Sequence, residues 1–130
     1  MIAADTSTWV SFLEGAPGED ARQLDKALAD RQVLMVPVVL TELLSDPKLH
    51  PDVIQILSEI PQLEVGPGYW ERAGLLRAKV LSRGRKARLG DALIAQSCMD
   101  EEITLLTRDR DFRAFAETAG LEIVWGPARG

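Results

Sequence analysis

The sequence predicts one domain of the α/β class, with helices on both faces of a central parallel sheet. Short apolar segments alternate with segments of helical periodicity along the chain, which is the pattern of parallel strands joined by helices. A chain of 130 residues is the size of one domain and can bury a substantial core without disulfides. No repeat, linker or low-complexity segment divides it. We therefore expect residues 1–130 to form a single domain.

The first strand and the two helices after it are predicted from apolar spacing and from a break between the helices. Met1–Ala4 is a short strand of weak propensity, since alanine is depleted in strands. Ser7–Leu13 is predicted helical and ends before the Gly-Ala-Pro-Gly segment 15–18. Glu19–Asp30 is the second predicted helix, because apolar residues recur along one face. These residues are Ala21, Leu24, Ala27 and Leu28.

Two further strands and two further helices follow. The apolar run Val33–Val36 predicts the second strand, and Pro37–Leu44 the helix after it. Proline is favoured at the first helical position, because an N–H there would have no partner within the helix. Pro51–Ile60 is the next predicted helix, and Leu63–Val65 is a short third strand.

The long predicted helix Tyr69–Ser82 and the loop Arg83–Leu89 contain a concentration of basic residues. The chain has a net charge of -5, yet residues 72–88 contain seven bases and no acid, and 10 of the 15 bases lie between residues 72 and 113. Such a run is either a solvated helix face with a basic loop or a surface that binds nucleic-acid phosphates. The inward face of the helix is predicted to consist of Trp70, Ala73, Leu76 and Val80.

The C-terminal part predicts two strands and two helices. Asp91–Asp100 is a helix, Ile103–Leu106 the fourth strand, and Phe112–Thr118 a helix that Gly120 ends. Leu121–Trp125 is the last strand. The residues predicted to be buried on the first of these helices are Ala92, Ile94, Ala95, Cys98 and Met99.

Composition excludes several kinds of site. One cysteine, Cys98, excludes an internal disulfide and a cysteine-rich zinc site, and one histidine, His50, excludes a multi-histidine metal site. No apolar run reaches the roughly 18 residues of a membrane span, and no signal peptide is recognisable at the N-terminus. We therefore expect a cytoplasmic protein with no membrane partner.

Several acidic residues fall at or near the predicted strand ends. Asp5 follows the first strand, Asp109 lies just past the fourth, Asp91 opens a helix, and Glu42 lies in the helix after the second strand. Ligands of open α/β sheets bind outside the carboxyl ends of the strands, and Asp5 and Asp109 are expected to share one rim there if their strands are neighbours. Converging carboxylates repel one another unless a cation neutralises them, and carboxylate oxygens with water suit Mg²⁺ or Mn²⁺.

Each acid also has a simpler explanation when it is taken alone. Asp5, Asp91 and Asp109 precede helical segments, where aspartate is a preferred N-cap. Glu42 fits the solvent side of an amphipathic helix, and Asp111 fits a first-turn acid that faces the helix dipole. Helix capping accounts for the acids one at a time, but it does not account for their joint order along the chain.

Four segments in this order resemble the PIN-domain nucleases, and most closely the small bacterial VapC-type toxins of toxin–antitoxin pairs. They are Asp5-Thr6-Ser7, Thr41-Glu42-Leu43-Leu44, Asp91-Ala92-Leu93-Ile94-Ala95 and Leu105-Leu106-Thr107-Arg108-Asp109-Arg110-Asp111-Phe112. The resemblance spans essentially the whole chain. It implies a three-layer α/β/α fold with a central parallel sheet, an endoribonuclease that depends on Mg²⁺ or Mn²⁺, frequent homodimers, and inhibition by a small VapB-like antitoxin.

Carried over by position, the acidic quartet of the family is Asp5, Glu42, Asp91 and Asp109, with Asp111 as the alternative to Asp109. Our hypothesis is that Asp5 and Asp91 hold the metal most directly, while Glu42 and Asp109 act through water. Ser7 and Thr107 resemble the hydroxyl residues that commonly line this site, and both are equally well explained as capping or turn residues. The basic loop is expected to hold RNA phosphates through Arg83, Arg85, Lys86 and Arg88.

The residues leave alternatives for which surfaces bind a partner and for which function the domain has. An antitoxin competes with RNA for the basic surface, and a partner or dimer groove competes with ordinary core packing for Trp9, Phe12, Leu13 and Pro51–Ile60. The alternatives to a toxin are a PIN nuclease of RNA processing or DNA cleavage and an inactive PIN-like binding module. The RNA target, the antitoxin, the oligomeric state and the choice between Mg²⁺ and Mn²⁺ are not readable from the residues.

Overall fold

The computed structural model describes residues 1–128, and every predicted helix occurs in its expected order along the chain. The strands of the sheet are β1 (Ile2–Ala4), β2 (Thr104–Thr107) and β3 (Ile123–Trp125). A short 3₁₀ turn, η1 (Arg110–Phe112), precedes the last helix. The helices are α1 (Thr6–Leu13), α2 (Glu19–Ala29), α3 (Pro37–Leu44), α4 (Pro51–Glu59), α5 (Tyr69–Ser82), α6 (Leu89–Asp100) and α7 (Arg113–Ala119).

The sheet is parallel, with β2 between β1 and β3. In the register of the sheet, Ala4 lies beside Leu106 and Leu106 beside Val124, so the carboxyl ends of all three strands point to one edge. The backbone N–H of Asp5 continues the ladder by donating to the Leu106 carbonyl over 3.0 Å. The predicted convergence of the segments after the first and fourth strands is therefore confirmed.

The predicted strands Val33–Val36 and Leu63–Val65 are wrong as strands. The first segment makes two isolated parallel bridges instead of a ladder, Val33 with Ile2 of β1 and Met35 with Gln62, the residue just before the second segment. The first segment has no room for a ladder, because Val36 is already the N-cap of α3 and Pro37 starts the helix. Both segments still extend the sheet in space beyond its three-stranded part.

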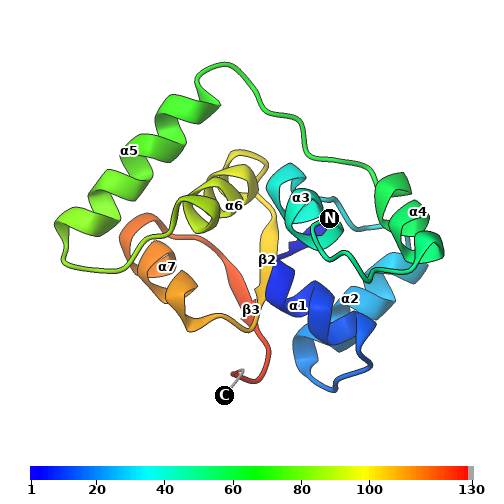
Figure 1. Ribbon diagram of the computed structural model, residues 1–130. Coiled ribbons are helices and arrows are strands. Elements are labelled where there is room, and N and C mark those ends of the chain that lie inside the picture. Colours follow the sequence, from blue (N-terminus) through cyan, green and yellow to red (C-terminus); the bar gives the residue numbers. More distant parts are fainter. Residues whose placement is uncertain (129–130) are drawn as a thin grey trace.

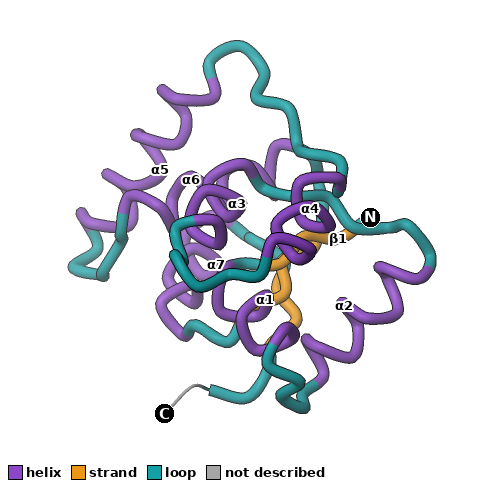
Figure 2. Tube along the Cα trace, turned by 45° about the vertical axis from the view of Figure 1, so that its right-hand side comes forward, coloured by secondary structure: helices purple, strands orange, loops and turns teal. Residues whose placement is uncertain are grey.

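The sheet is the middle of three layers. Figure 1 shows α1 and α2 on one side of the strands and α6 and α7 on the other, with α5 packed against the outer face of α6. Figure 2 shows the same arrangement from another angle, with the strands enclosed by helices. This confirms the expected α/β/α architecture. None of the helices within residues 1–128 combines the length and apolarity that crossing a bilayer requires.

The core fills the space between these layers, and one prediction about it needs correction. Trp9 is 2% exposed, so core packing explains it better than a partner groove. Trp70 is 63% exposed, and the prediction that it faces inward is wrong. The buried stripe of α5 is instead Tyr69, Ala73, Leu76 and Val80, whose spacing of four, three and four residues keeps them on one helix face. On α6 the burial prediction holds fully for Ala92, Ile94, Ala95 and Cys98, and Met99 is partly buried.

Candidate active site

Asp5 lies at the carboxyl end of β1 and is the N-cap of α1. Its side chain is 3% exposed and accepts hydrogen bonds from the Thr8 backbone N–H (3.0 Å), the Ser7 hydroxyl (2.8 Å) and the Thr107 hydroxyl (2.7 Å). Burial raises the pKa of Asp5 above its ordinary value. The three hydrogen bonds lower the pKa in part, and the nearby Asp109 raises it further. The N-cap explanation of Asp5 is thus correct, and the residue also stands at the floor of a pocket.

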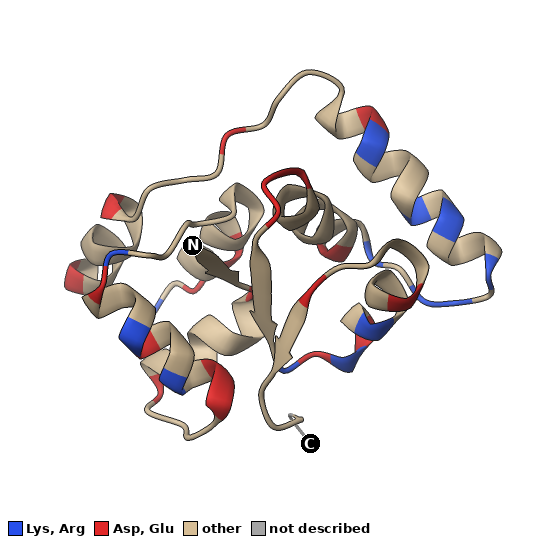
Figure 3. Ribbon diagram, turned by 180° about the vertical axis from the view of Figure 1, so that it is seen from behind, with Lys and Arg blue, Asp and Glu red and all other residues tan. Residues whose placement is uncertain are grey.

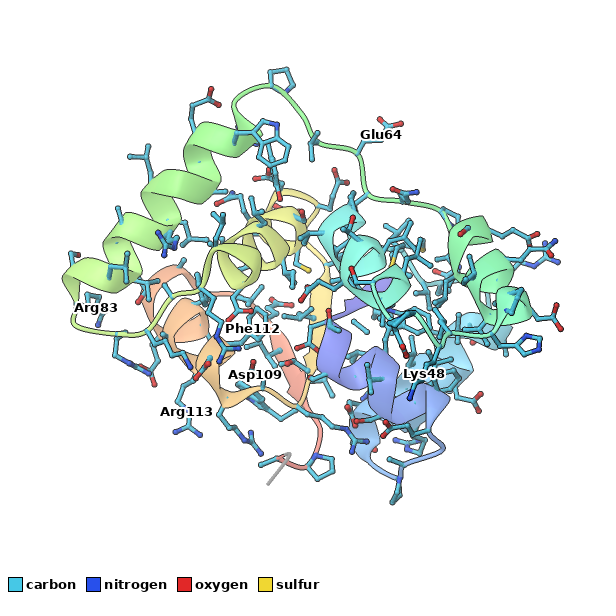
Figure 4. All side chains as sticks on the ribbon, in the orientation of Figure 1. Lys48, Glu64, Arg83, Asp109, Phe112 and Arg113 are labelled. Atoms are coloured by element: carbon cyan, nitrogen blue, oxygen red, sulfur yellow. The ribbon has the colours of Figure 1, made fainter. Side chains whose placement is uncertain are left out.

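The loop after β2 brings two more carboxylates to the same edge of the sheet. The backbone N–H of Asp109 donates to the Thr107 hydroxyl over 3.0 Å, and the backbone N–H of Asp111 donates to Asp109 Oδ1 over 2.9 Å. Asp109 is the N-cap of η1, and both side chains are about 30% exposed. Figure 4 shows Asp109 between α1 and α7, while Arg113 extends outward from α7. The structure places both Asp109 and Asp111 at the site.

Asp91 reaches the pocket from α6. That helix begins at Leu89 with Arg88 as its N-cap, so Asp91 lies within the first turn and the N-cap explanation fails for it. Its Oδ2 atom is buried and has no hydrogen-bond partner among the described residues. Carboxylate oxygens of Asp91, Asp109 and Asp111 lie within 4.8 Å of one another. Burial and then the charge of Asp109 raise the pKa of Asp91 to about 7, with Arg88 opposing the shift.

Glu42 closes the pocket from α3. Its Oε1 accepts a hydrogen bond of 3.0 Å from the Thr6 hydroxyl, which ties α3 to the start of α1. The cavity at this point has a volume of about 330 Å³. The residues that line it are Asp5, Thr6, Ser7, Val10, Glu42, Arg88, Asp91, Ile94 and Asp109. All four members of the predicted acidic quartet therefore face one cavity.

A larger cavity of about 490 Å³ lies elsewhere and does not compete as an active site. Its lining includes Ile103 and Leu121, which immediately precede β2 and the β3 segment, so it opens at the amino ends of the strands. Ligands of parallel sheets bind at the carboxyl ends. The smaller cavity combines that position with converging carboxylates.

The predicted RNA-binding bases separate into two groups. Lys86 lies 3.2 Å from Asp111, and Arg88 lies 3.8 Å from Asp111 and 4.0 Å from Asp109, so these two cations face the acidic pocket. Arg83 and Arg85 contact α7 instead, donating to the Thr118 hydroxyl over 3.2 Å and to Glu117 over 2.5 Å. Figure 3 marks in blue the positions of Lys and Arg along α5 and the following loop.

The donor set of the pocket fits a hard divalent cation. Three carboxylates lie close enough to share one ion, and one of their oxygens is buried without a partner among the described residues. Mg²⁺ and Mn²⁺ prefer such oxygen ligands, and an ion would offset the mutual repulsion of these acids. The cluster consists of Asp91, Asp109 and Asp111, whereas the oxygens of Asp5 already accept several hydrogen bonds.

Sequence reasoning missed the ion pair behind this loop. Arg108 is 6% exposed and its Nε donates to Asp20 Oδ2 over 2.7 Å, while Asp20 is fully buried. In the sequence Arg108 is one of several bases near Asp109, and Asp20 is an ordinary first-turn acid of a helix. The partners are 88 residues apart, so no local spacing connects them. Only the burial of Arg108 or Asp20 would have pointed to this ion pair, and that burial is visible only in the three-dimensional packing.

Comparison with known proteins agrees with the fold. Over 132 aligned residues, covering 92% of this chain and 91% of the relative, the sequence is 27% identical to ribonuclease VapC5 of Mycobacterium tuberculosis. The crystal structure of VapBC-5 from the same organism matches with a TM-score of 0.69 and 23% identity, covering 95% of this chain and 97% of the other. DNA-bound VapBC from Salmonella typhimurium gives a TM-score of 0.73 and 21% identity, with coverages of 95% and 98%.

The family model for the PIN domain matches residues 2–118. This match extends from the first residue of β1 to the end of α7 and includes every acid of the pocket. The chain therefore belongs to the PIN domain family.

Proposed function

We propose that the chain is a metal-dependent endoribonuclease and the toxin of a VapBC pair. The convergence of Asp5, Glu42, Asp91 and Asp109 on one cavity, with Asp111 beside them, carries the proposal. The relative of M. tuberculosis is named a ribonuclease, and several structural neighbours are toxin–antitoxin complexes, which supports the same function here. A toxin of this kind acts on RNA in the cytoplasm.

The metal is assigned to the three-carboxylate cluster of Asp91, Asp109 and Asp111. A Mg²⁺ or Mn²⁺ ion bound there supplies Lewis-acid chemistry, lowering the pKa of the attacking water and neutralising charge on the scissile phosphate. Asp5 organises the cluster from behind, because its hydrogen bonds with Ser7 and Thr107 fix the start of α1 against the end of β2. This assignment gives Asp5 a less direct role than the sequence hypothesis does.

The remaining residues of the pocket have distinct tasks in this proposal. Glu42 stands on the opposite wall from the β2 loop and positions the attacking water. Lys86 and Arg88 offset the negative charge of the acids and hold a phosphate of the RNA backbone at the rim. Without them the acidic cavity would repel a phosphodiester.

The proposed partners are an RNA substrate, a small VapB-like antitoxin and a second copy of the chain. The antitoxin proposal rests on the toxin–antitoxin neighbours, which share the fold over nearly the whole chain. The homodimer rests on the family resemblance, and the size of the purified protein in solution tests it. A DNA-binding antitoxin encoded beside the gene would separate a toxin from a PIN nuclease of RNA processing.

The test of the proposed reaction is cleavage of total cellular RNA by purified protein with Mg²⁺, with Mn²⁺ and with excess EDTA. Asp91→Asn should reduce the rate by about 100-fold or more, the scale of losing a group that stabilises transition-state charge. Asp25→Asn, which removes an exposed carboxylate of α2, is the matched control and should cleave like the wild type. Equal cleavage by wild type and Asp91→Asn would overturn the proposal, once co-purified antitoxin has been excluded by mass spectrometry.

A further inference from the structure

The strongest unassigned feature is the buried ion pair between Arg108 and Asp20, directly behind the candidate metal cluster. Arg108 Nε donates to Asp20 Oδ2 over 2.7 Å, and its Nη2 donates to the Pro17 carbonyl over 2.7 Å. The Thr8 hydroxyl donates to the same Asp20 oxygen over 2.7 Å. Burial alone would raise the pKa of Asp20, yet the hydrogen bonds from Arg108 and Thr8 hold it below its ordinary value.

Arg108 and Asp109 are adjacent in the chain but serve different sides of the loop. The backbone of Asp109 is extended, and successive side chains of an extended segment point in opposite directions. Asp109 therefore lines the acidic cavity while Arg108 reaches back to the segment before α2. An anchor on one side of the loop fixes the direction of the carboxylate on the other.

Two hydrogen-bonded links connect the ion pair to the pocket. The backbone N–H of Arg108 donates to the Ser7 hydroxyl over 3.0 Å, and that hydroxyl donates to Asp5. Thr8 forms the second link, because its N–H donates to Asp5 and its hydroxyl to Asp20. Arg108, Asp20 and Asp5 thus share one network.

The backbone approaches the ion pair closely at two glycines. A Cβ on Gly18 would lie 2.6 Å from Arg108 Nη2 and 2.7 Å from Asp20 Oδ1, and the φ of +151° also favours glycine there. A Cβ on Gly126 would overlap the Asp20 carboxylate outright. The ion pair is therefore tightly packed against the backbone on two sides.

We propose that Arg108 is a positioning residue, which acts through its backbone and its ion pair with Asp20 to hold Asp109 and Asp111 in metal-binding geometry. This inference rests on the proposed function, since it assigns Arg108 a part in that site. A buried ion pair gives little net stability compared with an apolar pair of the same size. The contribution of this pair is therefore to fix the orientation of the loop. Groups behind metal ligands commonly tune metal affinity by holding those ligands in place.

The first arm of the test measures Mn²⁺ affinity by calorimetry for wild type, Arg108→Lys and the double variant Asp20→Asn with Arg108→Gln. Arg108→Lys keeps the charge and removes the second donor to Pro17. The double variant removes both charges, so it leaves no unpaired buried ion and keeps the protein folded. Both should bind Mn²⁺ about 10-fold more weakly than the wild type, as for other groups that support metal ligands.

Leu57→Ala is the matched control, because it removes a side chain that is 1% exposed on α4, away from the site. It should lower the thermal stability and leave the Mn²⁺ affinity unchanged. A drop in Mn²⁺ affinity with Leu57→Ala equal to that with Arg108→Lys would reduce Arg108 to a general stability role and overturn the inference. Wild-type affinity in both Arg108 variants would do the same.

The second arm needs no metal and separates this inference from the proposed function. Amide hydrogen exchange of the metal-free protein should become faster at residues 107–112 in Arg108→Lys, and not in Leu57→Ala, relative to the rest of the sheet. If the wild type binds no Mn²⁺, the proposed function fails, while selective loosening of residues 107–112 still supports the positioning role. Unchanged exchange at these residues would refute it.

Discussion

Two groups of carboxylates lie on opposite sides of one short loop, and the protein treats them differently. Asp20 has a guanidinium partner at 2.7 Å and a lowered pKa, although it is fully buried. Asp91, on the pocket side, has a pKa raised to about 7 by burial and by Asp109. Both lie within a few residues of helix N-termini, and each has one buried oxygen without a hydrogen-bond partner among the described residues, so neither feature separates them. The difference is that Asp20 forms a direct ion pair with Arg108, whereas Asp91 lies beside other acids and Arg88 only opposes the rise of its pKa.

A cluster of acids that its neighbouring cations offset only in part is a cost that folding alone does not explain. Burial and repulsion disfavour the charged form of Asp91, whereas the ion pair of Asp20 satisfies a charge that is even more buried. Clusters with perturbed pKa values concentrate at functional sites. The contrast therefore supports the proposal that a divalent cation binds in the pocket, whereas Asp20 has its cation, Arg108, within the chain.

The largest expected effect is stabilisation by a bound divalent cation. At a Mn²⁺ concentration of 100 times Kd, binding should raise the free energy of unfolding by about 2.7 kcal/mol, and the Tm by roughly 10 °C for a domain of this size. Differential scanning fluorimetry with and without Mn²⁺ measures this. Asp25→Asn should show the same rise, and Asp91→Asn should show little or none. A full rise in Asp91→Asn would mean that the ion binds elsewhere and would break the comparison.

The sequence predicted one side of this comparison and missed the other for a physical reason. Asp5 and Asp109 closely follow strands, so the order of elements along the chain predicts that they meet, and the family resemblance adds Glu42 and Asp91. Arg108 and Asp20 pair across 88 residues through packing that no periodicity encodes. The same limit applies to Lys86 and Arg85, which are neighbours in the loop yet contact Asp111 and Glu117 respectively.

Errors in the fold have equally local causes. A one-residue shift separates Tyr69 from Trp70, and a shift of one position rotates a side chain by about 100° around a helix. The predicted strand Val33–Val36 failed because Pro37 starts a helix at once, which leaves the segment two isolated bridges instead of a ladder. Helix positions were predictable from apolar periodicity, while short strands depended on neighbours that the sequence does not reveal.

The next effect concerns the pH dependence of the metal-free protein. The pKa of Asp91 rises from 3.8 to about 7 on folding, so between these values the folded state holds a proton that the unfolded state has lost. The stability contributed by this group is therefore present below about pH 4 and declines as the pH rises toward 7. A full shift of this size corresponds to about 4 kcal/mol, and since the pocket opens to solvent we expect ~1–2 kcal/mol.

Asp91→Asn removes this penalty and should be more stable than the wild type at pH 8 in EDTA, with a smaller difference at pH 4. Urea unfolding at the two pH values measures both free energies. Asp25→Asn provides the baseline for losing an exposed charge. If Asp91→Asn is less stable than the wild type at pH 8, the carboxylate has a compensating partner in the folded protein, and the contrast with Asp20 disappears.

The smallest expected effect sharpens the contrast between the two groups of basic residues. Lys86→Gln with Arg88→Gln removes cations that face the pocket, whereas Arg83→Gln with Arg85→Gln removes the same charge from side chains that contact α7. Binding of single-stranded RNA is measured in EDTA, so that cleavage does not interfere. The first pair should weaken binding more, and the slope of log K against log salt should fall by about 0.7 for each RNA phosphate that the variant no longer neutralises.

The two double variants have equal net charge, so a general electrostatic attraction would weaken RNA binding equally in both. A larger effect for Lys86 and Arg88 requires that RNA lies at the rim of the pocket, where these cations also offset Asp109 and Asp111. Their removal acts twice in the same direction, because it takes positive charge away from the RNA phosphates and leaves the acids free to repel the RNA backbone. Equal weakening would place RNA on the broad basic surface instead. Lys86 and Arg88 would then have no special part in the chemistry of the pocket.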